Sequence, residues 1–165
     1  QLEEVTFRRT VIPVQELLDA AGKYFKKLMK NRPERIELEI EPMEAKVIGD
    51  VNQLRFLLEN LIDEALTVRE DGVIRLQARK DNEYIRFLFT DTRREKSVEE
   101  LNQLFYPNLA RMTSGEKGEL RGTEYLVCKQ IIRDHDEFAG RRGCRINAEP
   151  AEGGGFTVYF TIPRR

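Results

Sequence analysis

The chain has 165 residues, of which 40% are hydrophobic, and its 28 lysines and arginines nearly balance its 29 aspartates and glutamates. This length fits one domain of about 100–200 residues with a substantial core, and the near-neutral charge disfavours nucleic acid or an anionic membrane as a general electrostatic partner. No apolar run approaches the roughly 18–20 residues that span a bilayer, and two cysteines with one histidine exclude a disulfide framework and any mechanism that needs two histidines.

The first third of the chain reads as a strand, a helix and two further strands. Residues 3–13 are rich in β-formers and end at Pro13, which fits the first position of a helix. Apolar residues then recur at three- and four-residue steps over 14–29, which predicts an amphipathic helix of about five turns. Alternation of apolar residues with glutamate predicts a strand at 36–40 with one wet face, and a short strand follows at 45–49.

The middle of the chain reads as a helix followed by a hairpin. Asp50 is well placed to cap a helix whose apolar stripe runs over residues 51–65. A Glu-Asp-Gly turn then leads into an alternating run at 73–80, and a short polar turn separates it from a second alternating run at 84–91. Two such runs joined by a short turn predict a β-hairpin.

The last third contains a long loop, a helix and two strands. Residues 92–121 hold charged and flexible stretches around a short amphipathic piece at 98–107, which predicts a mobile segment with a small helix inside it. A helical pattern resumes at 124–135, and strands are expected within 141–150 and 156–163. This order of elements predicts an α/β two-layer sandwich, a mixed sheet covered on one face by about three helices.

Five motifs follow one another along the chain, of which the first is the stretch GDVNQLRFLLENLIDEALTV. It resembles the Gly-Asp, leucine-spaced helix and Asn-Leu-x-x-Asn-Ala motif of histidine-kinase ATP-binding domains, of the GHKL class. FLFTD stands where the first glycine box follows a strand, LFYP where a Phe-centred box lies in the lid, and GTEY where the second glycine box opens a helix. GGGFTVYFTIP matches the closing turn and strand. The resemblance covers nearly the whole chain and implies one GHKL-type domain over residues 1–165, with the lid at about 92–121.

The resemblance also assigns the residues of a nucleotide site. In the family a carboxylate accepts a hydrogen bond from the adenine amino group, and Asp91 retains it. Glu64 stands where the family has the Asn that binds Mg²⁺, and Asn60 stands where gyrase-like and chaperone ATPases carry a catalytic Glu, which is the pattern of the kinase branch. The nucleotide-site positions implied in this way are Asn60, Glu64, Asp91, Arg93, Glu95, Gly122, Thr123 and Glu124.

Several of these positions depart from the family pattern. Glycine lets a phosphate reach the backbone, yet Arg93 and Glu95 replace both glycines of the first box and Glu124 replaces one in the second. With these glycines gone, we expect Arg93 to fill the pocket rather than to bind a phosphate. Glu64, Glu95 and Glu124 add negative charge, and a like-charge pair at 4 Å costs about 4 kcal/mol at an effective dielectric constant near 20. We therefore expect ATP recognition to be severely weakened.

Three functional hypotheses follow. The first is a degenerate sensor histidine-kinase domain that serves as a non-catalytic signalling or interaction module of a two-component system, with no catalytic residue, cofactor or metal. The alternative is a divergent but active domain that binds Mg-ATP through Asp91, Asn60 and Glu64, in which case Glu64 is the Mg²⁺ ligand. The third is nucleic-acid binding through arginine clusters such as RRGCR, which the balanced charge disfavours.

The remaining polar and thiol groups are expected to be structural. His135 lies at a helix end, and the family's phospho-accepting histidine belongs to a separate upstream helical domain, so a structural role fits His135 better. Cys128 and Cys144 are expected to be reduced packing residues of a cytoplasmic protein. The chain opens at Gln1 rather than Met, which favours a domain excised from a longer parent, and its sequence leaves open whether that parent is anchored in a membrane.

Partners are expected to be proteins of a bacterial signalling system, including the upstream dimerisation region of the parent, with no nucleic acid and no direct membrane contact. The lid offers an apolar surface for such a partner. The competing interpretation is that the same side chains pack on the sheet and plug the vacant pocket, in a collapsed and ordered lid. These side chains are Leu101, Leu104, Phe105, Tyr106, Leu109 and Met112.

Overall fold

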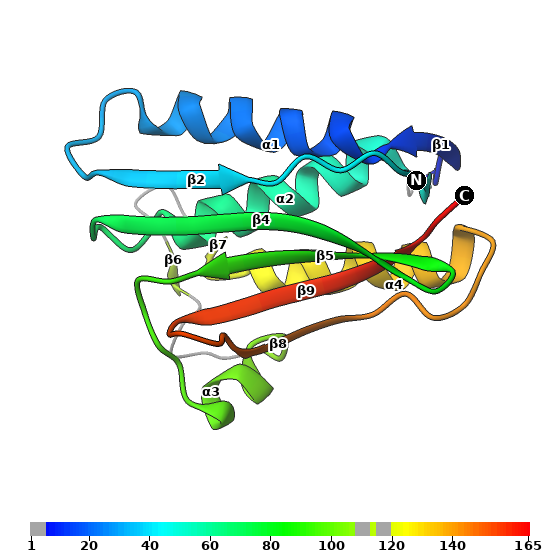
Figure 1. Ribbon diagram of the computed structural model, residues 1–165. Helices are drawn as coiled ribbons and strands as arrows, with labels where there is room; N and C mark the ends of the chain where they lie inside the picture. The colour runs from blue at the N-terminus through cyan, green and yellow to red at the C-terminus, as the bar shows by residue number, and fades with distance from the viewer. Residues whose placement is uncertain (1–5, 108–112, 115–119) are drawn as a thin grey trace.

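The computed structural model describes residues 6–107, 113–114 and 120–165, and it has two layers (Figure 1). A five-stranded mixed sheet in the order β2-β4-β5-β9-β8 forms one layer, and helices α1, α2 and α4 cover one of its faces. The predicted fold class is thus confirmed. The elements are β1 (Thr10–Pro13), α1 (Val14–Met29), β2 (Ile36–Ile40), β3 (Lys46–Gly49), α2 (Val51–Ala65), β4 (Gly72–Asp81), β5 (Tyr84–Asp91), α3 (Val98–Gln103), β6 (Thr113–Ser114), β7 (Leu120–Arg121), α4 (Glu124–Phe138), β8 (Ile146–Pro150) and β9 (Phe156–Pro163).

The sheet is built around the predicted β4–β5 hairpin. Its turn contains Asn82 with a φ of 55°, a left-handed conformation that asparagine tolerates. β9 pairs antiparallel with β5, β8 pairs antiparallel with β9, and β2 joins the far edge parallel to β4. Register places Phe87 opposite Phe160 on the core face, where their rings stack with centroids 4.8 Å apart. This pairing also brings Asp91, the last residue of β5, beside the first residue of β9.

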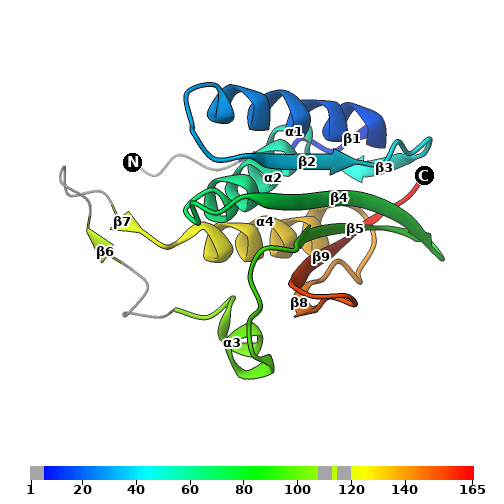
Figure 2. The ribbon, with the colours of Figure 1, turned by 60° about the vertical axis from the view of Figure 1, so that its left-hand side comes forward.

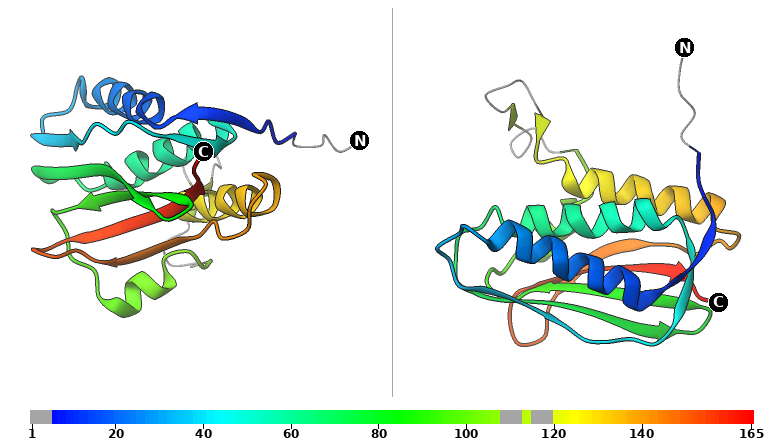
Figure 3. Two further views of the ribbon diagram at one scale, coloured as in Figure 1. Left: turned by 45° about the vertical axis from the view of Figure 1, so that its right-hand side comes forward. Right: turned by 90° about the horizontal axis from the view of Figure 1, so that it is seen from above.

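The helical layer follows the apolar periodicity of the sequence. α2 lies between α1 and α4 when the molecule is seen from above (Figure 3). The predicted cap is confirmed, since the Asp50 carboxylate accepts a hydrogen bond from the backbone N–H of Gln53 at 3.1 Å. The stripes of α1, α2 and α4 join the core face of the sheet in a single apolar cluster.

The amino-terminal strand is shorter than predicted. Only residues Thr10–Pro13 form β1, which pairs with β3 in a separate two-stranded sheet, because upstream the backbone N–H of Arg8 turns to the Asp50 carboxylate instead. Pro13 is the cap residue of α1 rather than its first helical residue, since its ψ of 129° is extended. β8 likewise begins only at Ile146, while α4 continues past the predicted end to Phe138.

Between β5 and α4 the structure contains the expected small helix, α3. Ser97 and Glu100 form a reciprocal capping box at its start. The pair β6–β7 was not predicted, and Figure 2 shows it standing away from the sheet. Leu109 and Met112 lie outside the described residues. No helix within the described ranges is long and apolar enough to cross a membrane.

Candidate nucleotide site and its internal arginine

Three of the predicted site residues, Glu64, Asp91 and Arg93, lie where the end of β5 meets the end of α2. Asp91 is buried at the last position of β5, and Glu64 lies in the last turn of α2. Both line one small cavity, which Tyr125 of α4 also borders. The structure therefore brings together two of the carboxylates that the sequence singled out.

This cavity is apolar on most of its surface and small. Its walls include Phe89, Phe156 and Val158 from the sheet, and its volume is ≈ 50 Å³. A water occupies roughly 10–15 Å³ by the same measure, whereas small-molecule sites span about 300–1,000 Å³. The space beside Asp91 is therefore the size of a few waters and well below the range of small-molecule sites.

The carboxylate of Asp91 is engaged by the side chain two residues further on. Arg93 donates from Nε to Oδ1 and from Nη2 to Oδ2 of Asp91, both at 2.9 Å, and its backbone N–H donates to Oδ1 at 3.0 Å. The two side chains are 1% and 5% exposed, so this bidentate pair is buried. Such fork-to-fork pairs are the strongest and most directional of protein hydrogen bonds.

The rest of the Arg93 guanidinium is satisfied by backbone carbonyls at and beyond the end of α2. Nη1 donates to the carbonyls of Val68 and Glu70, each at 2.9 Å, and Nη2 donates to that of Ala65 at 2.6 Å. All five guanidinium N–H groups therefore have an acceptor. Carbonyls at a helix carboxyl end carry partial negative charge, which favours a cation there.

Two glycines that sequence reasoning did not single out make room for this arrangement. Gly72 has a φ of +145°, and a Cβ on it would lie 2.5 Å from Cγ of Arg93. Gly155 has a φ of +84°, and a Cβ there would clash with the backbone carbonyl of Asp91. The Asp-Gly and Gly-Gly-Gly turns were the only sequence signals for these positions, and neither indicates which side chain approaches.

The other predicted positions are dispersed around this pair. The Asn60 side-chain amide is buried and donates to the carbonyl of Phe56 within α2, at 2.8 Å. Glu95 is exposed. Thr123 is the N-cap residue of α4 but makes no side-chain capping hydrogen bond, and it follows Gly122, which has a φ of +81°.

Glu124 begins α4, and its Oε2 is buried without a hydrogen-bond partner among the described residues. Burial, and secondarily the charges of Glu124 and Glu64, raise the pKa of the Cys128 thiol. No group of three or more potential metal-ligating side chains occurs in the described part of the chain.

Around α3, most of the predicted lid residues that the structure describes are buried. Leu101, Leu104 and Phe105 join the core cluster, and the Phe105 ring meets Tyr125 edge-on at 5.7 Å. Tyr106 is 55% exposed, with the Lys129 ammonium 4.3 Å from its ring centroid. Among these four side chains only Tyr106 is exposed.

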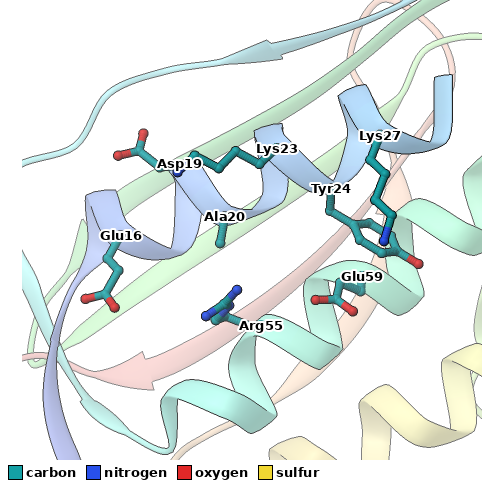
Figure 4. A pocket seen from close by; sticks show the side chains of 8 residues that line it. All are labelled: Glu16, Asp19, Ala20, Lys23, Tyr24, Lys27, Arg55 and Glu59. Atoms are coloured by element: carbon teal, nitrogen blue, oxygen red, sulfur yellow. The ribbon is translucent and has the colours of Figure 1, made fainter. Parts of the chain in front are cut away.

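A wider groove runs between α1 and α2, away from the predicted site (Figure 4). Its volume is ≈ 690 Å³, and three acidic and three basic side chains line it together with Ala20 and Tyr24. The Tyr24 hydroxyl donates to Asp63 at 2.6 Å, and burial together with that carboxylate raises the pKa of Tyr24. The balanced charges of this open groove select no class of ligand.

Comparison with known proteins agrees with the fold and the order of motifs. A model of the family described as "Histidine kinase-, DNA gyrase B-, and HSP90-like ATPase" matches residues 49–165. A search of curated proteins gives no significant match. The mycobacterial sensor histidine kinase MprB superposes with a TM-score of 0.73 at 18% identity, covering 96% of this chain and 99% of that one. The nucleotide-free catalytic domain of histidine kinase ThkA gives 0.72 at 21% identity, covering 97% and 98%.

Two longer structures also contain this fold. Full-length ShkA in complex with AMPPNP gives a TM-score of 0.73 at 15% identity, covering 98% of this chain and 32% of that one. ThkA in complex with the response regulator TrrA gives 0.72 at 19% identity, covering 99% and 44%. In both proteins the matched part is one portion of a larger chain.

Proposed function

Because the chain belongs to the histidine kinase-, DNA gyrase B- and HSP90-like ATPases, we propose that it is a degenerate histidine-kinase ATP-binding domain, a non-catalytic signalling or interaction module of a two-component system. The observation that carries the proposal is the buried Asp91–Arg93 pair. The carboxylate expected to read adenine has both oxygens engaged by a neighbouring side chain and is 5% exposed, so a base would have to compete with Arg93 for it.

The chemistry around the pair supports the same conclusion. An incoming triphosphate would approach Glu64, which lines the cavity beside Asp91. By the resemblance it would also approach Glu124, which already has a buried oxygen without a hydrogen-bond partner among the described residues. Both glycines of the first phosphate-binding box are long charged side chains, Arg93 and Glu95. The residues present therefore do not fit Mg-ATP.

The partner side of the proposal rests on the surface around α3. Val98 and Tyr106 are exposed there, while Leu101, Leu104 and Phe105 hold the helix against the core. The ThkA structure in complex with a response regulator shows that a relative of this fold assembles with such a protein. We propose proteins of a signalling system, including an upstream dimerisation region, as partners, and a cytoplasmic location for the domain.

Thermal unfolding with and without nucleotide tests the proposal. The melting temperature is measured with 5 mM ATP, ADP or AMPPNP plus Mg²⁺, with GTP and MgCl₂ alone as controls. A ligand at 100 times its Kd stabilises a protein by about 2.7 kcal/mol, which raises Tm by several degrees at this size. We expect no shift. A Mg²⁺-dependent shift specific to adenine nucleotides would refute the proposal and favour the active alternative, with Glu64 as the Mg²⁺ ligand.

A further inference from the structure

We propose that the Arg93 guanidinium is a built-in ligand in an acceptor-only cradle, and that the cradle binds small guanidinium and amidinium compounds when this side chain is removed. The inference rests on the proposed function, since it explains why the site is closed to nucleotide. It adds a ligand class, planar cations rich in N–H donors, and predicts a binding activity that the unaltered chain conceals.

The cradle selects this class because every group facing the guanidinium is an acceptor. Two are the carboxylate oxygens of Asp91, and three are the carbonyls of Ala65, Val68 and Glu70. The acceptors surround one planar group with five N–H donors, which an ammonium with three cannot match. The acceptors carry negative charge on both sides of the guanidinium, because the Asp91 carboxylate lies on one side and the carboxyl end of α2 on the other.

Contacts that do not involve Arg93 hold the walls of the cradle in place. Asp91 is held in the sheet by its pairing with Ile74 and Phe156. Next to it, Thr92 donates to the carbonyl of Val73 from both its backbone N–H and its hydroxyl, at 3.1 and 2.6 Å. The cradle is therefore expected to keep its shape when the Arg93 side chain is truncated.

The adjoining apolar cavity gives the site a second feature. Asp91, Ala65 and Val68 line this cavity as well as contacting Arg93, so the two spaces share a wall. The aromatic side chains of Phe89 and Phe156 form part of the far side. Removal of the Arg93 side chain would leave an acceptor-lined space directly beside this apolar cavity, which suits a flat ring bearing an amidinium group.

The experiment compares Arg93→Ala with Arg94→Ala and the unaltered chain. Arg94 is the matched control because it is adjacent, has the same side chain and also lines the apolar cavity, but makes its ion pair with Glu70 on the surface, at 55% exposure, and not with the cradle. Each protein is melted with 1–20 mM methylguanidinium, benzamidine or adenosine, and with methylammonium chloride at equal ionic strength. We expect methylguanidinium and benzamidine to raise the Tm of Arg93→Ala by about 3–5 °C at ten times their Kd, and to leave the other two proteins unchanged.

Each outcome bears on the inference. A folded Arg93→Ala that responds to neither cation, or that responds no more than Arg94→Ala, overturns it, and so does a response to adenosine alone. If Arg93→Ala does not fold unaided, its recovery from urea with and without methylguanidinium replaces the melting curve, and equal recovery overturns the inference. A Mg-ATP shift of the unaltered chain would refute the proposed function instead, so the two failures are distinguishable.

Discussion

Lowering the pH below 6.5 should destabilise this domain through its only histidine. His135 is fully buried in the last turn of α4. Its Nε2 accepts the backbone N–H of Asp50 at 3.1 Å, and its Nδ1 faces the carbonyl of Ile131 at 2.8 Å, so these partners assign the proton to Nδ1. A second proton, on Nε2, would point at the backbone N–H of Asp50, so two donors would face each other. It would also place a positive charge on a ring that packs edge-on against Phe7.

The sign follows from the direction of the shift. Burial lowers the pKa of His135, although the Ile131 carbonyl and the nearby charges of Asp50 and Asp134 act in the opposite sense. In the unfolded chain the pKa of a histidine is about 6.5. The contribution of His135 to the free energy of unfolding is therefore fully present above that pH and is lost as the pH falls toward the lower pKa of the folded state. If the ring stays neutral in the folded state down to pH 5.5, the loss between pH 7.5 and 5.5 is about 1.4 kcal/mol, and smaller otherwise.

Urea denaturation at four pH values between 7.5 and 4.5 measures this loss, with His135→Gln as the reference that cannot titrate. The carboxylates change the stability of both proteins with pH in the same way, so the difference between the two pH profiles isolates the effect of the His135 imidazole. Equal profiles would refute the reasoning. NMR titration of the single histidine ring is an independent check that works even where the variant is unstable, and a pKa at or above the ordinary value would contradict the geometry.

The remaining predictions concern packing. In urea denaturation Gly72→Ala should lower the free energy of unfolding more than Gly153→Ala. Both glycines have a positive φ, at which a side chain costs about 1–2 kcal/mol. Only the Cβ added at position 72 would also push against Arg93, since a Cβ at position 153 has nothing within 4 Å. Equal losses would show that Arg93 does not fill the space above Gly72. Cys128 and Cys144 should resist a thiol reagent at pH 8 in the folded protein, because burial raises the pKa of both, that of Cys144 to about 12. Labelling at the rate of unfolded protein would contradict their burial.

The parts of the fold that were predictable are those set by neighbours in sequence. The apolar steps of α1 and α2, the Asp50 cap and the β4–β5 hairpin depend on residues a few positions apart, and all are confirmed. The parallel pairing of β2 with β4 and the separate β1–β3 sheet depend on distant segments, for which local periodicity carries no signal.

The same limit applies to the site. Resemblance located Asp91 at the end of a strand, and the structure places it there. The contacts of Arg93 could not be predicted from its place in the sequence. Three of its acceptors are carbonyls more than twenty residues earlier, and its methylene groups pack where Gly72 has no side chain. A side chain's direction depends on such surroundings, which motifs do not encode.

The Asp91–Arg93 pair also has a consequence for how long the folded domain persists. Arg93 also donates to carbonyls at and beyond the end of α2, so its full set of contacts closes only after the helix has docked on the hairpin. Interactions that form after the folding transition state act mainly on the unfolding rate. Breaking one side of a buried ion pair costs about 3–5 kcal/mol, so its loss would speed unfolding about 200- to 5,000-fold and leave the folding rate nearly unchanged. The arginine that closes the site would thereby set the lifetime of the native state.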